Sequence, residues 1–152
     1  MPKVFWAQEP LPEMGGGIFL AGPTPRENTG SPSWQAEALR LLQDYLGNVF
    51  VPEGRGFQYS GNYDGQVYWE LKALDLADIV LFWVPRDLDK LPGFTTNVEF
   101  GLVCGWEKAA VLGYPLGAPK TKYLRYLAET MGYTICHTLE RTVEGTLEHF
   151  LF

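Results

Sequence analysis

Short apolar runs bounded by glycine, proline and polar residues alternate along the chain with stretches that place apolar residues on one helical face. The first run is Gly17 to Ala21, followed by the turn Gly22-Pro23-Thr24-Pro25. Ser33 then opens a segment whose apolar residues recur at helical spacing until Gly47, which predicts a helix with a serine N-cap. The pattern therefore begins as a strand followed by a helix.

The same alternation continues to the end of the chain. It predicts further strands at 48–51, 78–84, 109–113 and 133–136. It predicts further helices at 66–76, from 95 or 96 through the segment EFGLVCGWEK, at 118–132 and at 139–152. The run from Asp78 to Val84 is apolar almost throughout, which is typical of a strand buried on both faces. We therefore place this strand at the centre of a sheet.

Strands that alternate with helices predict an α/β fold, here a single domain over residues 1–152 with a doubly wound parallel sheet. We expect five strands in the flavodoxin-like order second, first, third, fourth, fifth, and an extended N-terminal segment at 1–16. Ligands of such sheets bind beyond the carboxyl ends of the strands. The loops 22–31 and 85–97 are therefore expected to flank the binding site.

Composition and charge narrow the possible partners. The chain has 18 acidic and 12 basic residues and no Lys/Arg run, which argues against a nucleic-acid partner. No window approaches the ~18 unbroken apolar residues of a membrane helix, and the first residues lack the apolar core of a secretory signal. We expect a cytoplasmic protein that binds a small molecule and no membrane. Cys104 and Cys136 are expected to be free thiols, and no metal site is expected around His137 or His149.

Two glutamates carry the candidate chemistry. Glu70 and Glu99 each fall near the predicted start of a helix, so both carboxylates are expected at the same rim of the sheet. Paired carboxylates are the basic equipment for breaking a glycosidic bond. Glu99, close to a helix N-terminus, is expected to stay ionised and to act as a nucleophile. A glutamate in the first turn of a helix is also common for electrostatic reasons alone, so a structural role stays open.

Helix polarity separates these two acids from two others nearby. Asp75 falls at the end of a predicted helix and Asp78 at the start of a predicted strand. Both are therefore expected at the edge of the sheet opposite to the site. We expect structural or solvated roles for them.

Three segments, IFLAGPTPR, WELKALDLADIVLFWV and TTNVEFG, resemble the nucleoside 2-deoxyribosyltransferase superfamily in order and spacing. The resemblance covers roughly residues 17–115 and extends to the related deoxynucleoside monophosphate N-glycosidases. It implies an enzyme that needs no cofactor and moves 2-deoxyribose between nucleobases through a covalent intermediate on a glutamate. Glu99 matches that nucleophile. Glu70, eight positions before Asp78, matches the family's acidic residue and is expected to handle the base as general acid and base, with a raised pKa.

The chain departs from the family at positions that would contact the substrate. Phe19 stands where the family often has a tyrosine that orients the nucleophile, so the resemblance implies an altered contact there. Gly93 stands where the transferases tend to carry an aspartate, and Asn97, Asp87 or Asp89 is a candidate replacement. The segment after the first strand carries Gly22 and Pro23, where the N-glycosidases hold a 5′-phosphate.

Pro23 has no N–H to offer a phosphate, which favours a nucleoside over a nucleotide, although Arg26 remains a candidate phosphate ligand. The long loop 53–64 contains Phe57, Tyr59 and Tyr63, and its tyrosines are candidates to cover or stack on a base.

The family assembles its sites between subunits, so the resemblance and the apolar C-terminal segment HFLF suggest a homo-oligomer. The same segment is also compatible with docking on its own domain.

The expected partners are thus a deoxynucleoside and a free nucleobase. Two other functions stay open. One is hydrolysis of the N-glycosidic bond of a deoxynucleoside or deoxynucleotide, with water as the acceptor. The other is a non-catalytic nucleotide- or metabolite-binding domain, in which Glu99 is only a helix-start acid.

Overall fold

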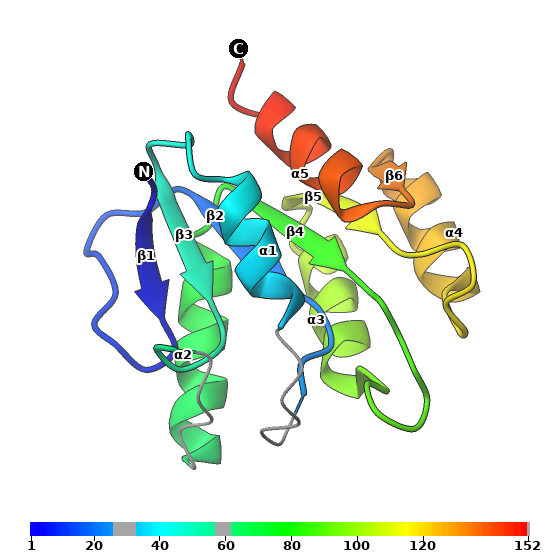
Figure 1. Cartoon of the computed structure of the whole chain (residues 1–152), viewed down its shortest axis with the longest axis horizontal. Coiled ribbons are helices and arrows are strands. Elements are labelled where there is room, and N and C mark those ends of the chain that lie inside the picture. The colour runs from blue at the N-terminus through cyan, green and yellow to red at the C-terminus, as the bar shows by residue number, and fades with distance from the viewer. Residues whose placement is uncertain (26–32, 57–61, 152) are drawn as a thin grey trace.

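The computed structural model describes residues 1–25, 33–56 and 62–151, which form a sheet with helices on both faces (Figure 1). The strands are β1 (Lys3–Trp6), β2 (Ile18–Ala21), β3 (Asn48–Val51), β4 (Ile79–Trp83), β5 (Ala109–Gly113) and β6 (Thr134–Cys136). The helices are α1 (Trp34–Leu41), α2 (Tyr63–Leu76), α3 (Phe94–Gly105), α4 (Lys122–Met131) and α5 (Leu139–Glu148). The α/β class predicted from the sequence is confirmed.

The strands of the described residues are parallel and lie in the order β1-β3-β2-β4-β5-β6. The strands β2 to β6 have the predicted flavodoxin-like order. The predicted number of five strands is wrong, because β1 lies within the segment 1–16 and pairs with β3 from Lys3 opposite Asn48 to Trp6 opposite Val51. A four-residue edge strand carries too short a pattern for periodicity to identify, and its pairing with β3 defines it.

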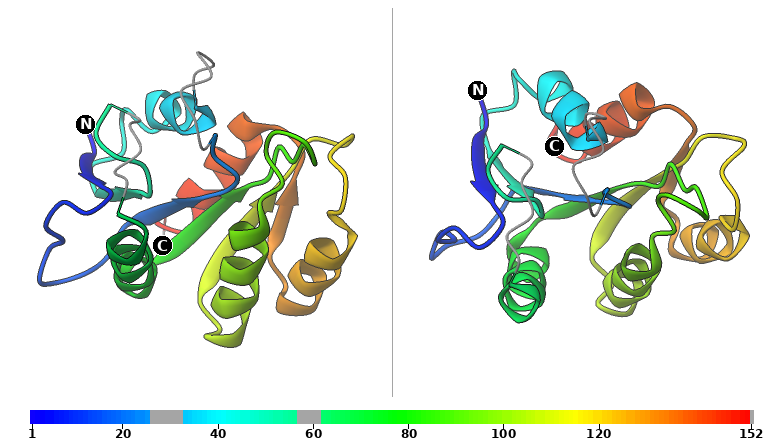
Figure 2. Two further views of the ribbon diagram at one scale, coloured as in Figure 1. Left: turned by 90° about the horizontal axis from the view of Figure 1, so that it is seen from below. Right: turned by 60° about the horizontal axis from the view of Figure 1, so that its bottom comes forward.

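Two helical layers enclose the sheet (Figure 2). The helices α1 and α5 cover one face, and α2, α3 and α4 cover the other. All five residues of β4 are buried, as predicted for a central strand. Because side chains alternate along a strand, Val80 and Phe82 pack with α2 and α3, while Leu81 and Trp83 pack with α1 and α5.

Three helices begin at residues other than those predicted. The helix α2 begins at Tyr63 because the side chain of Asn62 caps its first turn. The helix α3 begins at Phe94, directly after Gly93, whose left-handed backbone sets the direction of entry. The helix α4 begins at Lys122 and is shorter than predicted, and α1 and α5 end before their predicted boundaries. The shift at α2 changes the position of Glu70 along its helix.

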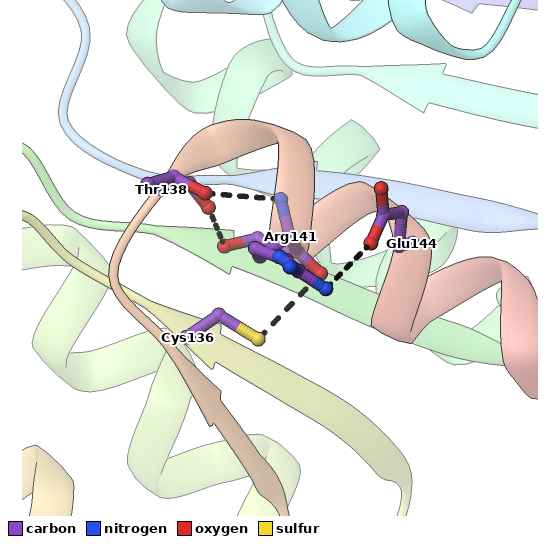
Figure 3. Close-up of polar contacts among 5 residues, drawn as sticks. Cys136, Thr138, Arg141 and Glu144 are labelled. Carbon is purple, nitrogen blue, oxygen red and sulfur yellow. Dashed lines mark hydrogen bonds and ion pairs between the residues drawn. The ribbon is translucent and has the colours of Figure 1, made fainter.

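The last helix is anchored on the end of β6 (Figure 3). The Thr138 hydroxyl accepts a hydrogen bond from the backbone N–H of Arg141 at 3.2 Å and so caps α5. The thiol of Cys136 donates to the Arg141 carbonyl at 3.5 Å, and the Arg141 guanidinium lies 3.5 Å from the Glu144 carboxylate. Cys104 and Cys136 are both free, as predicted. These contacts fix the first turn of α5 on the sheet.

Candidate active site

The loops that follow β2 and β4 meet at the carboxyl edge of the sheet. At Gly93, a Cβ atom would lie 2.6 Å from Cγ of Pro23, and the φ of 67° also favours glycine there. At Gly22, a Cβ atom would lie 2.0 Å from the carbonyl oxygen of Trp83, so only glycine lets these two strand ends approach. Gly22 and Pro23 therefore pack against the end of β4 and the start of α3.

Glu99 lies in the second turn of α3 and is half-buried. One carboxyl oxygen, Oε2, is inaccessible to solvent and has no hydrogen-bond partner among the described residues. Burial, and next the negative charge of Glu70, raise the pKa of Glu99 to about 8. The carboxyl group of Glu99 therefore changes its charge near pH 8.

Glu70 lies in the third turn of α2 and is also half-buried. Its Oε1 atom accepts a hydrogen bond of 2.9 Å from the side-chain amide of Gln66, one turn earlier. The same amide nitrogen donates to the carbonyl oxygen of Pro52 at 2.8 Å, just beyond the end of β3. Burial raises the pKa of Glu70, and the hydrogen bond from Gln66 opposes that rise. The site thus holds two interacting carboxyl groups, both with a raised pKa.

A comparison with protein families identifies the family of this chain. The family model described as "Nucleoside 2-deoxyribosyltransferase like" matches residues 16–115, about two thirds of the chain. The chain belongs to this family. The matched region runs from β2 to β5 and includes Glu70 and Glu99. A search of curated proteins gave no match.

Both glutamates of this nucleoside 2-deoxyribosyltransferase-like chain lie further along their helices than predicted. Glu70 is the eighth residue of α2, and Glu99 is the sixth residue of α3. The side-chain amide of Gln66 joins Glu70 to the Pro52 carbonyl just beyond β3, and α2 extends past the carboxyl end of that strand (Figure 1). The charge of Glu70 acts on Glu99, so the two acids lie near each other, while their catalytic roles stay a prediction.

The expectation that Glu99 stays ionised at neutral pH is wrong. The stabilising effect of a helix N-terminus is largest within the first turn, and Glu99 lies beyond it. Burial and the charge of Glu70 act in the opposite direction and dominate. The direction predicted for the pKa of Glu70, upward, is confirmed.

The other residues predicted to contact substrate are dispersed. Phe19 is fully buried in the core beneath α2 and α3. Tyr63 is 69% exposed as the first residue of α2. Asn97 lies two residues before Glu99, hence about 200° around the helix, and so points away from it. Arg26 lies outside the described residues, as do Phe57 and Tyr59.

Sequence reasoning missed the role of Arg86, which joins three segments next to the site. Its guanidinium donates to the side-chain oxygen of Asn97 and to the backbone carbonyl of Lys120. Arg86 is only 5% exposed, and burial lowers its pKa. It thereby links the end of β4 to the first turn of α3 and to the segment before α4. No spacing rule connects these positions, so only the tertiary structure reveals the contact.

Gln66 and Glu53 were also missed. Gln66 precedes Glu70 by four residues, and this helical spacing alone could have identified the pair. Glu53 follows Pro52, and burial raises its pKa against a hydrogen bond from Ser33. Its Oε2 atom has no hydrogen-bond partner among the described residues. A third partly buried carboxyl group therefore lies one residue beyond the Pro52 carbonyl.

The two aspartates assigned to the opposite edge of the sheet have contacts there. The Oδ2 atom of Asp78 accepts a hydrogen bond from the backbone N–H of Gly17 at 2.7 Å. The Lys108 ammonium donates to the backbone carbonyl of Asp75 at 3.1 Å. The structural role predicted for Asp78 is confirmed.

An open cleft of about 640 Å³ lies beyond the carboxyl ends of β5 and β6, lined in part by Lys122, Arg125 and His137. Neither Glu70 nor Glu99 lines it, so the candidate chemistry lies elsewhere on the rim.

Across residues 1–25, 33–56 and 62–151, no group of three or more His, Cys, Asp or Glu side chains is arranged to hold a metal ion. In the same part of the chain, no helix is long and apolar enough to span a membrane.

Proposed function

We propose that this protein transfers 2-deoxyribose between nucleobases through a covalent glycosyl-enzyme on Glu99. The observation that carries the proposal is the pair of half-buried carboxyl groups, Glu70 and Glu99, that influence each other's protonation at the carboxyl rim. Membership of a nucleoside 2-deoxyribosyltransferase-like family supports the substrate class. Two carboxyl groups in different protonation states are what a retaining displacement at a sugar carbon requires.

In the first half-reaction, the ionised carboxylate of Glu99 attacks C1′ of the deoxyribose. A C1′–O bond forms, the C1′–N bond to the donor base breaks, and its electron pair goes to the base nitrogen. Glu70 gives its proton to the departing base. The products are the free base, a deoxyribosyl ester on Glu99 and an ionised Glu70.

In the second half-reaction, a nitrogen of the acceptor base attacks C1′. The ester bond to Glu99 breaks, and its electron pair returns to the carboxylate. Glu70 takes the proton that the acceptor nitrogen loses, which restores the starting state. If water attacks instead, the same two residues hydrolyse the bond, which is the main alternative function.

The pKa values of the two carboxyl groups match this cycle. Glu99 has a pKa of about 8 in the presence of charged Glu70, so near neutral pH the pair holds one proton. The first half-reaction uses the form in which Glu70 carries that proton and Glu99 is charged. Above about pH 8 the proton is lost, and Glu70 no longer protonates the leaving base. A bell-shaped dependence of kcat/KM on pH is therefore expected.

The substrate we propose is a neutral deoxynucleoside with a free nucleobase as acceptor. The net charge of −6 disfavours a nucleic-acid chain. Pro23 offers no N–H at the rim, where a phosphate would need donors. The two free cysteines suit a reducing compartment such as the cytoplasm.

We further propose a homo-oligomer that buries apolar side chains next to the site. On α2, Tyr68 is 66% exposed and Leu71 is 45% exposed, and on α3, Val98 is 71% exposed. Sedimentation velocity should report an assembly larger than a monomer. A monomer at micromolar concentration would contradict this part of the proposal.

The function is tested by incubating the protein with a deoxynucleoside, with and without a second free base. Transfer predicts a new deoxynucleoside only when the second base is present, and its formation should be lost in Glu99→Gln. Base release at the same rate with and without acceptor would favour the hydrolase. No base release from any deoxynucleoside would favour a non-catalytic binding domain.

A further inference from the structure

The side-chain amide of Gln66 is held in one orientation. Its nitrogen lies 2.8 Å from the Pro52 carbonyl, which only accepts hydrogen bonds, so the NH2 group must face that way. Its second N–H is directed to Oε1 of Glu70 at 2.9 Å. Both donors of the amide are thus used, and Gln66 acts toward Glu70 only as a donor.

The N-terminal segment supports this orientation from the other side. The side-chain nitrogen of Gln8, just after β1, lies 3.5 Å from Oε1 of Gln66 and donates to the Asn62 carbonyl at 3.1 Å. The backbone N–H of Ala7 donates to the carbonyl of Glu53 at 2.9 Å, which ties the end of β3 to the same segment. The edge strand missed in the sequence pattern therefore braces the group that contacts Glu70.

A fixed donor on Oε1 determines which oxygen of Glu70 handles protons. Oε1 already accepts the hydrogen bond from Gln66, which favours Oε2 as the oxygen that carries the proton that Glu70 gives and takes. A donor to a carboxyl group also favours its charged form over its neutral form. Gln66 therefore acts in opposite senses on the two half-reactions: it opposes the acid form of Glu70 and supports the base form.

We infer that Gln66 is a positioning residue that keeps Glu70 in the carboxylate form needed to take the proton from the incoming acceptor. This inference rests on the proposed function. Once Glu99 carries the deoxyribosyl ester, it has no charge and no longer opposes the ionisation of Glu70. Burial alone then opposes the charged form, and the hydrogen bond from Gln66 is the contact that counteracts it.

The charged groups on the surrounding elements do not replace this contact. Glu99, on α3, is the neighbour whose charge is coupled to that of Glu70. Glu53, beyond β3, is another acid and offers Glu70 no positive charge. Glu9, on the segment after β1, is paired with Arg55 at 2.7 Å. Among the described residues, no cation lowers the pKa of Glu70, so the amide of Gln66 has that task.

The test separates the two half-reactions in Gln66→Met, which keeps the length of the side chain and removes its donors. Rapid-quench measurements with a deoxynucleoside give the rate of base release in the first turnover. Addition of a free base then gives the rate at which the glycosyl-enzyme is consumed. We expect first-turnover release to remain within about threefold of wild type, while consumption falls about 100-fold, the scale of general-base catalysis. The glycosyl-enzyme should therefore accumulate.

Two further variants sharpen the result. Gln66→Lys retains a donor and should keep consumption within about tenfold of wild type, whereas the exposed control Gln43→Met should change neither step. In Gln66→Met, the pH dependence of consumption should move to higher pH, because Glu70 ionises less readily. An unchanged ratio of the two rates in Gln66→Met, or an equal loss in both steps, would overturn the inference.

The same experiment distinguishes a failure of the proposed function from a failure of the role of Gln66. If wild type forms a glycosyl-enzyme, and the ratio of base release to glycosyl-enzyme consumption in Gln66→Met equals that of wild type, only the role of Gln66 is wrong. If wild type releases no base and forms no covalent adduct, the proposed function fails and the role of Gln66 fails with it. If Gln66→Met does not fold, Gln66→Lys is compared with wild type instead. An about 100-fold slower consumption of the glycosyl-enzyme despite the retained donor would contradict the inference.

Discussion

Replacing Glu99 with glutamine should make the stability of the protein less sensitive to pH. The substitution keeps the shape of the side chain and removes its ability to ionise. In wild type, the pKa of Glu99 is about 8 in the folded protein against 4.5 for an ordinary glutamate, a difference of 3.5 pH units. Between these values the folded state holds a proton that the unfolded state has released, so stability is lost as pH rises through this window.

The magnitude follows from linkage. Each pH unit within the window costs about 1.4 kcal/mol of unfolding free energy, so the full window corresponds to at most about 5 kcal/mol. Between pH 5.5 and 7.5, wild type should lose up to about 2.7 kcal/mol through this one group. Glu99→Gln should lose none through it. The variant should therefore be the more stable protein at pH 7.5, although it is expected to be inactive.

Urea denaturation at intervals from pH 5 to 9 measures this difference directly. The exposed Glu13 provides a matched control, because Glu13→Gln removes a carboxyl group without touching the site. Subtracting the curves removes the contribution of other groups such as Glu53 and leaves that of Glu99 together with its effect on the ionisation of Glu70, to which it is coupled. Parallel curves for wild type and Glu99→Gln would refute the reasoning, since they would mean that Glu99 ionises as readily when folded as when unfolded.

Three other substitutions test separate parts of the account. Glu70→Gln removes a charge that, together with burial, raises the pKa of Glu99. The ionisation of Glu99 in single-turnover pH profiles should therefore move to lower pH, and turnover should fall about 100-fold. A pH profile that does not move would contradict the coupling of the two carboxyl groups. Gly22→Ala places a methyl group 2.0 Å from the Trp83 carbonyl oxygen, so urea denaturation should show an unfolding free energy lower by about 3 kcal/mol or more. A variant as stable as wild type would show that the loop relaxes freely. Asp75→Asn lies at the opposite edge and should keep turnover within about twofold of wild type; a loss like that of Glu70→Gln would reverse the assignment of the rim.

The order of the sheet could be predicted because the relevant signals are local. The apolar run around β4 and the alternation of strands with helices leave few topologies once crossovers are right-handed. The edge strand β1 was missed because its four residues carry no periodic signal, and only its pairing with β3 distinguishes it from an extended segment.

The proximity of Glu70 and Glu99 and the raised pKa of Glu70 were predicted from the sequence, but the raised pKa of Glu99 was not. A helix-start argument gives an ionised Glu99, whereas burial and the charge of a neighbour on another helix give the opposite result. Neither quantity can be read from sequence spacing. Arg86 and Asn97 illustrate the same limit, since their contact joins a loop to a helix through the tertiary fold.

The central claim is that Glu99 becomes covalently attached to deoxyribose. The most direct measurement is mass spectrometry of protein quenched in acid during turnover of a deoxynucleoside, followed by peptide mapping. The account predicts one deoxyribosyl group on the peptide that contains Glu99, lost when a free nucleobase is added before quenching. Base exchange by a protein that carries no adduct, or an adduct that persists in Glu99→Gln, would contradict it.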